Sequence, residues 1–163
     1  MRNMMLKLAA GAVGGAVATY LMNRSMPLAK KLPARFQPQM PSSDPGHFMV
    51  TQGEKLVGAL SPKVHSGAAQ GLHWAYGVSW PFGLAALSGV LGLRSVGKTV
   101  AAGAVLGAIV WAVGYAGWLP AAGLTPRVHR VPLAKSASGL FSHVAYGALA
   151  SLPLALASPR IEA

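Results

Sequence analysis

Two histidines occur in the same five-residue motif, H-x-A-Y-G, near the start of two apolar segments. His73 and Tyr76 belong to the first copy, H-W-A-Y-G, and His143 and Tyr146 belong to the second, H-V-A-Y-G. In a helix, the His, Tyr and Gly of each copy stand at positions i, i+3 and i+4, so they share one face. Two imidazoles that face one another across a helix bundle could ligate a b-type haem, with the glycines leaving room for the macrocycle.

Other chemistry is open to the same residues. The two imidazoles could bind a transition metal, with His65 or His129 as a third ligand, or a quinone-like ligand, or they could handle protons. The simpler interpretation is that each histidine hydrogen-bonds a group on a neighbouring helix, while Tyr76 belongs to the aromatic belt at the membrane surface. On this interpretation the protein has no cofactor, and haem b is the alternative.

Most catalytic mechanisms need acidic residues or cysteines, and both are scarce here. The chain has no cysteine, which excludes disulfides, thiolate metal sites and cysteine nucleophiles. Its three acidic residues are Asp44, Glu54 and Glu162, and none of them lies in an apolar segment. They provide no plausible catalytic triad, no pair of carboxylates within the apolar segments and no H-E-x-x-H zinc motif. We therefore expect that the protein is not an enzyme.

Four apolar segments must position the repeated motifs. Only 10% of the 163 residues are charged, against about a quarter in a soluble domain. The segments are 4–22, 71–93, 99–119 and 137–157, and apart from Lys7 they contain no charged side chain. Each approaches the roughly 20 helical residues that cross a hydrocarbon core of about 30 Å. Since the runs are continuous rather than alternating, they predict helices and an all-α integral membrane protein.

The first segment has a second interpretation, as a signal peptide. It has a basic start, a short apolar region and an A-V-A sequence at 16–18 that resembles a cleavage site. The apolar run continues beyond that site to Met22, which favours a membrane span.

The fourteen Lys and Arg residues all lie near the ends of these segments or between them. Basic residues beside apolar helices contact anionic lipid headgroups, at about 1 kcal/mol each, so we expect no nucleic-acid partner. Connections 23–70 and 120–136 hold nine cations, against five on the opposite side. The positive-inside rule then predicts a multi-pass protein of the bacterial inner membrane, with cytoplasmic connections and external termini. The expected headgroup contacts are Arg24, Lys30, Lys31, Arg35, Arg127 and Arg130.

The long connection 23–70 is itself divided. Its part at 25–46 contains five prolines, which argues against regular structure. In 50–60, apolar side chains fall near helical spacing, with charged residues opposite them. We expect a short interfacial helix there, which ends before Pro62.

The four segments form two similar pairs. The sequence at 9–16 matches that at 101–108 in seven of eight positions, and the two H-x-A-Y-G motifs match one another. Two tandem two-helix repeats, related by a pseudo-twofold axis along the membrane normal, would form a four-helix bundle. Glycines in G-x-x-x-G pairs, and those after the tyrosines, would let helix backbones approach closely within one subunit. These packing glycines are Gly11, Gly15, Gly77, Gly103, Gly107 and Gly147.

Four motifs in this order resemble the YagU-like family of bacterial inner-membrane proteins. They are G-A-V-G-G-A-V-A-T, H-W-A-Y-G, G-W-L-P-A-A-G-L-T-P and H-V-A-Y-G, and the resemblance covers residues 11–147. It implies a four-helix integral membrane protein from a family without an established activity.

Together these features predict a structural or accessory role, as a non-catalytic subunit or helper of a membrane complex. Its partners would be the lipid bilayer, other membrane proteins or a second copy of the chain. The alternative is a bis-histidine haem- or metal-binding membrane protein. A small-solute carrier or channel is the third hypothesis, and the lack of a charged lining weakens it.

Overall fold

The computed structural model describes residues 2–161, and every regular element in that range is helical. The prediction of an all-α protein is therefore confirmed. The long helices are α1 (Arg2–Ala29), α3 (Pro62–Leu87), α4 (Val96–Trp111) and α6 (Leu133–Ile161). The shorter elements are α2 (Pro45–Val57), α5 (Leu119–Ala121), a π-helical segment η2 (Ala112–Trp118) and two 3-10 turns, η1 (Ala34–Phe36) and η3 (Val128–Arg130).

Three helical stretches within the described range are long and apolar enough to cross a membrane. They are Asn3–Ala29 in α1, Val96–Ala121 in α4 with η2 and α5, and Leu133–Ala157 in α6. This length and composition are those of a membrane protein. Three of the four predicted spans are thus recovered, each as part of a longer helical stretch than expected.

The second predicted span, 71–93, has different bounds in the structure. Helix α3 begins at Pro62, where the proline occupies the first turn and needs no hydrogen-bond partner, and it ends at Leu87. Beyond Leu87 the chain turns, and Gly92 adopts a left-handed conformation with φ of 61°. The part of the predicted span that lies in α3, 71–87, therefore has about 17 residues and a length of about 25 Å, which is less than the hydrocarbon thickness of a typical bilayer.

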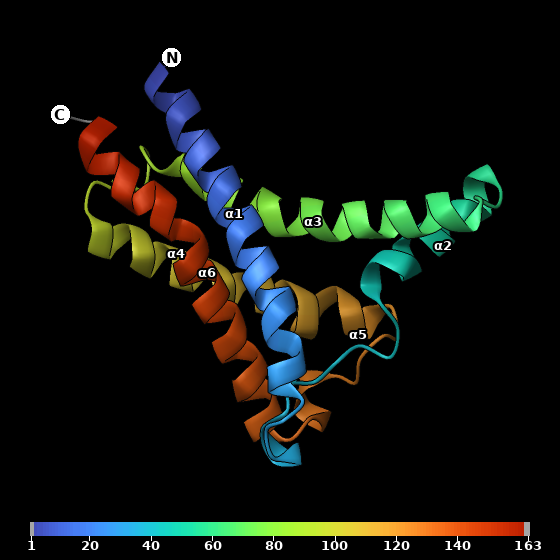
Figure 1. The fold of residues 1–163 in the computed structure, drawn as a ribbon. Helices are drawn as coiled ribbons and strands as arrows, with labels where there is room; N and C mark the ends of the chain where they lie inside the picture. The colour runs from blue at the N-terminus through green and yellow to red at the C-terminus, as the bar shows by residue number, and fades with distance from the viewer. Residues whose placement is uncertain (1, 162–163) are drawn as a thin grey trace.

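The long helices form two crossing pairs rather than four parallel rods (Figure 1). Helices α1 and α6 lie side by side and antiparallel, with the two ends of the chain at the same end of the molecule. Helix α3 crosses α1 and projects away from it, and α2 folds back along the projecting part. Helix α4 packs mainly on α6, while α3 and α4 touch only slightly. The expected four-helix bundle of equivalent repeats is not confirmed.

Helix α1 uses glycines on two faces to approach two neighbours. A Cβ atom added to Gly11 would stand 2.7 Å from the carbonyl oxygen of Pro81, and one added to Gly15 would stand 2.9 Å from Val78 Cα, both on α3. Gly14 meets the backbone carbonyl of Ala150 on α6 in the same manner. Only glycine leaves room for backbones this close, so α1 packs tightly against both α3 and α6.

Helix α4 approaches α6 through its own glycine pair. Gly103 lies against the Gly147 carbonyl, and Gly107 lies against the His143 carbonyl. The two glycine interfaces differ in register by about one helical turn. Gly103 contacts α6 at the level at which Gly15, rather than Gly11, contacts α3. The sequence alignment pairs Gly103 with Gly11, so the two halves of the chain are not superimposable copies in their packing.

Apolar side chains are abundant on the outer surface. Val13, Val17, Val105 and Phe141 are all more than half exposed, with Phe141 at 73%. The buried clusters instead consist largely of small residues and a few leucines, such as Leu84, Ala85, Leu93 and Leu154. An exterior of this kind is disfavoured in water and is suited to lipid.

The predicted short helix at 50–60 is present as α2, but it starts five residues earlier. The Asp44 side chain caps it by accepting a hydrogen bond from the His47 N–H at 3.0 Å, with Pro45 in the first turn. The irregular stretch predicted for 25–46 is correspondingly shorter, because α1 continues past Pro27 to Ala29.

A polar contact ties α2 to the start of α3. The Glu54 carboxylate accepts hydrogen bonds from the Leu60 N–H at 3.0 Å and from His65 Nδ1 at 3.1 Å, and His65 stacks on His47 with ring centroids 5.1 Å apart. The Leu60 and His65 hydrogen bonds hold the pKa of Glu54 below its usual range. Since these hydrogen bonds favour the charged carboxylate, this hairpin is most stable above the ordinary carboxyl pKa.

The glycine interface between α4 and α6 gives a direct prediction. We expect Gly107→Ala to destabilise the protein by about 1–3 kcal/mol, because the new methyl group would meet the His143 carbonyl. Gly97→Ala, on the same helix but with open space around it, is the matched control and should be neutral or stabilising. Unfolding in mixed micelles measures both changes, and equal effects would contradict the interface.

Candidate functional site

His73 lies on α3 and forms a hydrogen bond with a side chain of α1. Its Nε2 is 3.1 Å from Asn23 Oδ1, so the carboxamide oxygen accepts a hydrogen bond from the ring. The side chain is exposed, and it borders a polar depression together with Asp44, His47 and Gln70. The histidine therefore links two helices at an open surface.

His143 lies in a different environment on α6. Its Nδ1 is 2.8 Å from the carbonyl oxygen of Gly139, four residues earlier on the same helix. Its ring packs perpendicular to that of Tyr115, with centroids 5.7 Å apart, and the side chain borders a cavity. His143 thus bonds its own helix, whereas a bond to a neighbouring helix was expected.

The two histidines do not share a pocket. Among the described residues, no group of three or more His, Cys, Asp or Glu side chains could hold a metal ion. The residues considered as third ligands lie elsewhere, because His65 pairs with Glu54 and His129 lies in η3 beside a separate surface hollow. His73 and His143, the two histidines expected to face one another, line different pockets.

The two tyrosines of the repeated motif also have different roles. Tyr146 is 6% exposed, and its hydroxyl donates a hydrogen bond to the Gly77 carbonyl on α3. Tyr76 is 40% exposed and packs edge-on against Trp80, at 5.9 Å between centroids. Gly77 itself is covered by Thr19 of α1. Tyr146 therefore joins α6 to α3 at the place where α1 crosses α3.

The π-helical segment η2 was not anticipated from the sequence. It contains Tyr115, which stacks on Trp111 with centroids 6.4 Å apart and nearly parallel rings. Segments of this type widen a helix and often occur at functional sites. The signal that could have indicated it is Pro120, because a proline lacks the N–H group and crowds the carbonyl four residues before it.

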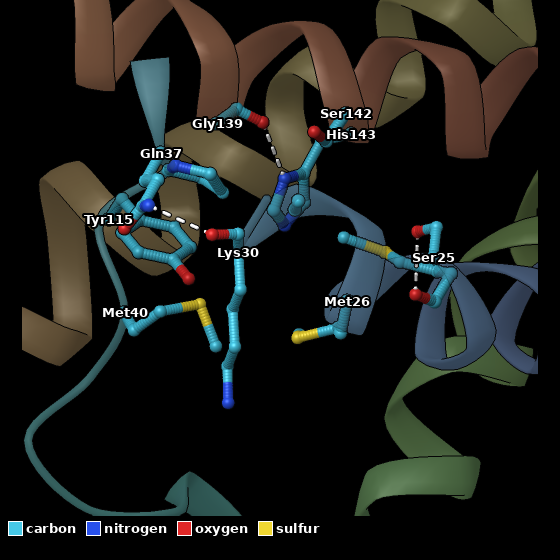
Figure 2. Close-up of a pocket in the computed structure, with 12 residues that line it drawn as sticks. Ser25, Met26, Lys30, Gln37, Met40, Tyr115, Gly139, Ser142 and His143 are labelled. Carbon is cyan, nitrogen blue, oxygen red and sulfur yellow. Dashed lines mark hydrogen bonds between the residues drawn. The ribbon is translucent and has the colours of Figure 1, made fainter. Parts of the chain in front are cut away.

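Segment η2 forms one wall of a cavity of about 80 Å³. The other walls come from the C-terminal part of α1, the connection after η1, and α6 (Figure 2). The lining residues are Met22, Ser25, Met26, Ala29, Lys30, Gln37, Pro38, Met40, Tyr115, Gly139, Ser142 and His143. The sequence analysis found His143 but missed the methionines, although Met22 and Met26 are one turn apart.

The basic residues expected at lipid headgroups are all exposed and lie in or beside two connections. Those connections meet, because the N–H and the hydroxyl of Ser42 both donate to the carbonyl of Leu124, at 2.8 and 3.2 Å. Two of the arginines lie over aromatic rings, Arg24 over Tyr20 and Arg35 over Phe36. The basic residues are Arg24, Lys30, Lys31, Arg35, Arg127 and Arg130.

Comparisons of this chain with protein-family models, curated proteins and solved structures found no match.

The Tyr146 hydrogen bond can be tested by removing one oxygen atom. We expect Tyr146→Phe to lower the free energy of unfolding by about 0.5–1.5 kcal/mol, because the partly buried Gly77 carbonyl loses its donor. Tyr76→Phe, at the equivalent and more exposed position of the other motif, should change it less. Equal losses in the two variants would contradict the assigned role.

Proposed function

We propose that the chain is a small integral membrane protein with a structural or accessory role, a non-catalytic subunit or helper of a membrane complex. One observation carries this proposal: two of the polar groups expected to do chemistry are engaged in joining helices. His73 bonds α1 and the Tyr146 hydroxyl bonds α3. Membership of the YagU-like family belongs to the same proposal and rests on the four motifs quoted above.

The proposal includes α3 as the fourth membrane-embedded helix. Its support is that Pro81 and Val78 of α3 contact Gly11 and Gly15, which lie in the apolar part of α1. A helix that packs this closely on a spanning helix shares its depth. The short part of the predicted span that lies in α3 can be accommodated by local thinning of the bilayer or by polar residues at its ends. Two tandem repeats, altered in register after duplication, remain the proposed origin of the fold.

Two other hypotheses have less support. A haem b ligated by both histidines would require them to leave separate pockets and face one another. A solute carrier or channel would require a polar path through the helices, whereas glycine contacts hold α1 closely against both α3 and α6. Detergent-purified protein should accordingly lack a Soret absorption band.

The orientation proposed is that of a bacterial inner-membrane protein with cytoplasmic basic connections. Its support is that connections 30–44 and 122–132 lie together, at the end of the molecule away from the two ends of the chain (Figure 1). Cations concentrated on one side are retained in the cytoplasm during insertion.

Single cysteines test this orientation against a cysteine-free background. Ser43 is exposed in the first connection, and Val90 is 88% exposed in the turn between α3 and α4. We expect a membrane-impermeant maleimide to label Val90→Cys in cells with a permeabilised outer membrane, and Ser43→Cys only after lysis. The opposite pattern would reverse the orientation, and labelling of both in unlysed cells would contradict the span arrangement.

The accessory role is tested by purification from native membranes in mild detergent. We expect one membrane protein to be recovered in near-stoichiometric amount, and the chain to be recovered in turn when that partner carries the tag. An unrelated multi-pass protein with the same tag serves as the control. Recovery of the chain alone, in a form that converts a small molecule, would contradict the proposal.

A further inference from the structure

The cavity beside η2 collects soft donor atoms. Three of the seven methionines border it: Met22 and Met26 from α1, and Met40 from the connection after η1. Met22 and Met26 stand at positions i and i+4, so their side chains leave the same face of α1. His143 borders the cavity from α6, and Figure 2 shows Met26 and Met40 on either side of the Lys30 side chain, with His143 nearby.

The hydrogen bond of His143 prepares the other ring nitrogen for a ligand. A carbonyl oxygen only accepts hydrogen bonds, so the 2.8 Å contact with Gly139 places the ring proton on Nδ1. Nε2 then carries a lone pair, and the second ring nitrogen points into the cavity in Figure 2. Histidines that bind metals typically have this arrangement, in which one nitrogen donates to a carbonyl and the other coordinates the ion.

The composition of the lining selects the kind of ion. No carboxylate lines the cavity, so the charged oxygen ligands that Ca²⁺ and Mg²⁺ sites commonly use are lacking. Thioether sulfur is a soft ligand and favours Cu(I). The volume of about 80 Å³ is well below the roughly 300–1,000 Å³ typical of organic ligand sites, so an ion fits better than a cofactor.

We propose that this cavity is a Cu(I) site, in which the sulfur atoms of Met22, Met26 and Met40 and Nε2 of His143 are the ligands. Tyr115 is a positioning residue, because its ring packs perpendicular to the imidazole and limits its rotation. Copper binding is additional to the accessory role and does not depend on it.

Lys30 is the charged group that faces the same cavity, and its position is compatible with a cation there. The residue is exposed, and in Figure 2 its side chain passes between Met40 and Met26 and ends away from His143. Since the energy of repulsion scales with the product of the charges, a monovalent ion is repelled half as strongly as a divalent one. The lysine therefore adds to the preference for Cu(I) over divalent metals.

The test is a competition for Cu(I) between the detergent-purified full chain and bicinchoninate, under anaerobic and reducing conditions. We expect one Cu(I) per chain. Met26→Leu and Met40→Leu should each weaken binding at least about tenfold, the lower end of the loss seen when even a ligand's supporting partner is removed. Leucine nearly conserves the volume of methionine, so these variants should keep the fold.

Two methionines outside the cavity provide matched controls. Met49 on α2 is 50% exposed and Met5 near the start of α1 is 69% exposed, and neither lines the cavity. Met49→Leu and Met5→Leu should leave the affinity unchanged. X-ray absorption of the loaded protein should show sulfur and nitrogen neighbours of copper, and the nitrogen signal should be lost in His143→Gln.

Three results would overturn the proposal. The first is the absence of stoichiometric Cu(I) binding by the unaltered chain. The second is binding that is unaffected by both Met26→Leu and Met40→Leu, since the methionines then only fill space. The third is an equal loss in Met49→Leu, which would place the copper elsewhere. Circular dichroism of each variant separates a lost ligand from a lost fold.

Discussion

Close contact between helix backbones is the constraint on which the rest of this structure depends. In a bilayer, apolar side chains gain little by leaving lipid for the protein interior, so helices associate mainly through van der Waals packing and hydrogen bonds. Helix α1 makes two such close contacts, one through Gly11 and Gly15 with α3 and one through Gly14 with α6. Helix α4 makes one such close contact, through Gly103 and Gly107 with α6. The large apolar side chains are consequently free to face outward.

Close backbone approach also explains how polar groups are satisfied. A glycine leaves its carbonyl uncovered by a side chain, and at Gly77 that carbonyl accepts the hydroxyl of Tyr146 from a second helix. Such interhelical hydrogen bonds contribute on average only about 0.6 kcal/mol in membranes. Their larger effect is on geometry, because a hydroxyl that must find one acceptor defines the register of two helices.

The sequence predicts those features that depend on local pattern. Continuous uncharged runs predict the helical class, and the spacing of glycines on α1 and α4 indicates their contact faces. The sequence does not predict the end of α3 at Leu87 or the π-helical segment before Pro120, because both depend on how an interruption of the regular helix is accommodated.

The candidate site was less predictable than the helices. Met40 reaches the cavity from an irregular connection, while its other walls come from elements up to about a hundred residues away in the chain. No periodic pattern in the sequence indicates that these distant segments lie together. His143 could be identified because it belongs to a repeated motif. Its neighbours in the cavity could not, because they depend on how the connection runs across α1 and α6.

The two copies of H-x-A-Y-G show why a repeated motif need not give a repeated site. Each copy places its residues on one helix face, but α1 packs against both α3 and α6, whereas α3 and α4 hardly touch. Tyr146 therefore points toward a neighbouring backbone, while Tyr76, at the equivalent position, remains 40% exposed. In the same way, Asn23 engages the ring nitrogen of His73 that would otherwise be available, whereas His143 bonds its own helix and turns its second nitrogen toward the cavity. The asymmetry of packing around α1 thus makes the histidine of one motif copy an interhelical link and leaves the histidine of the other copy as a candidate ligand.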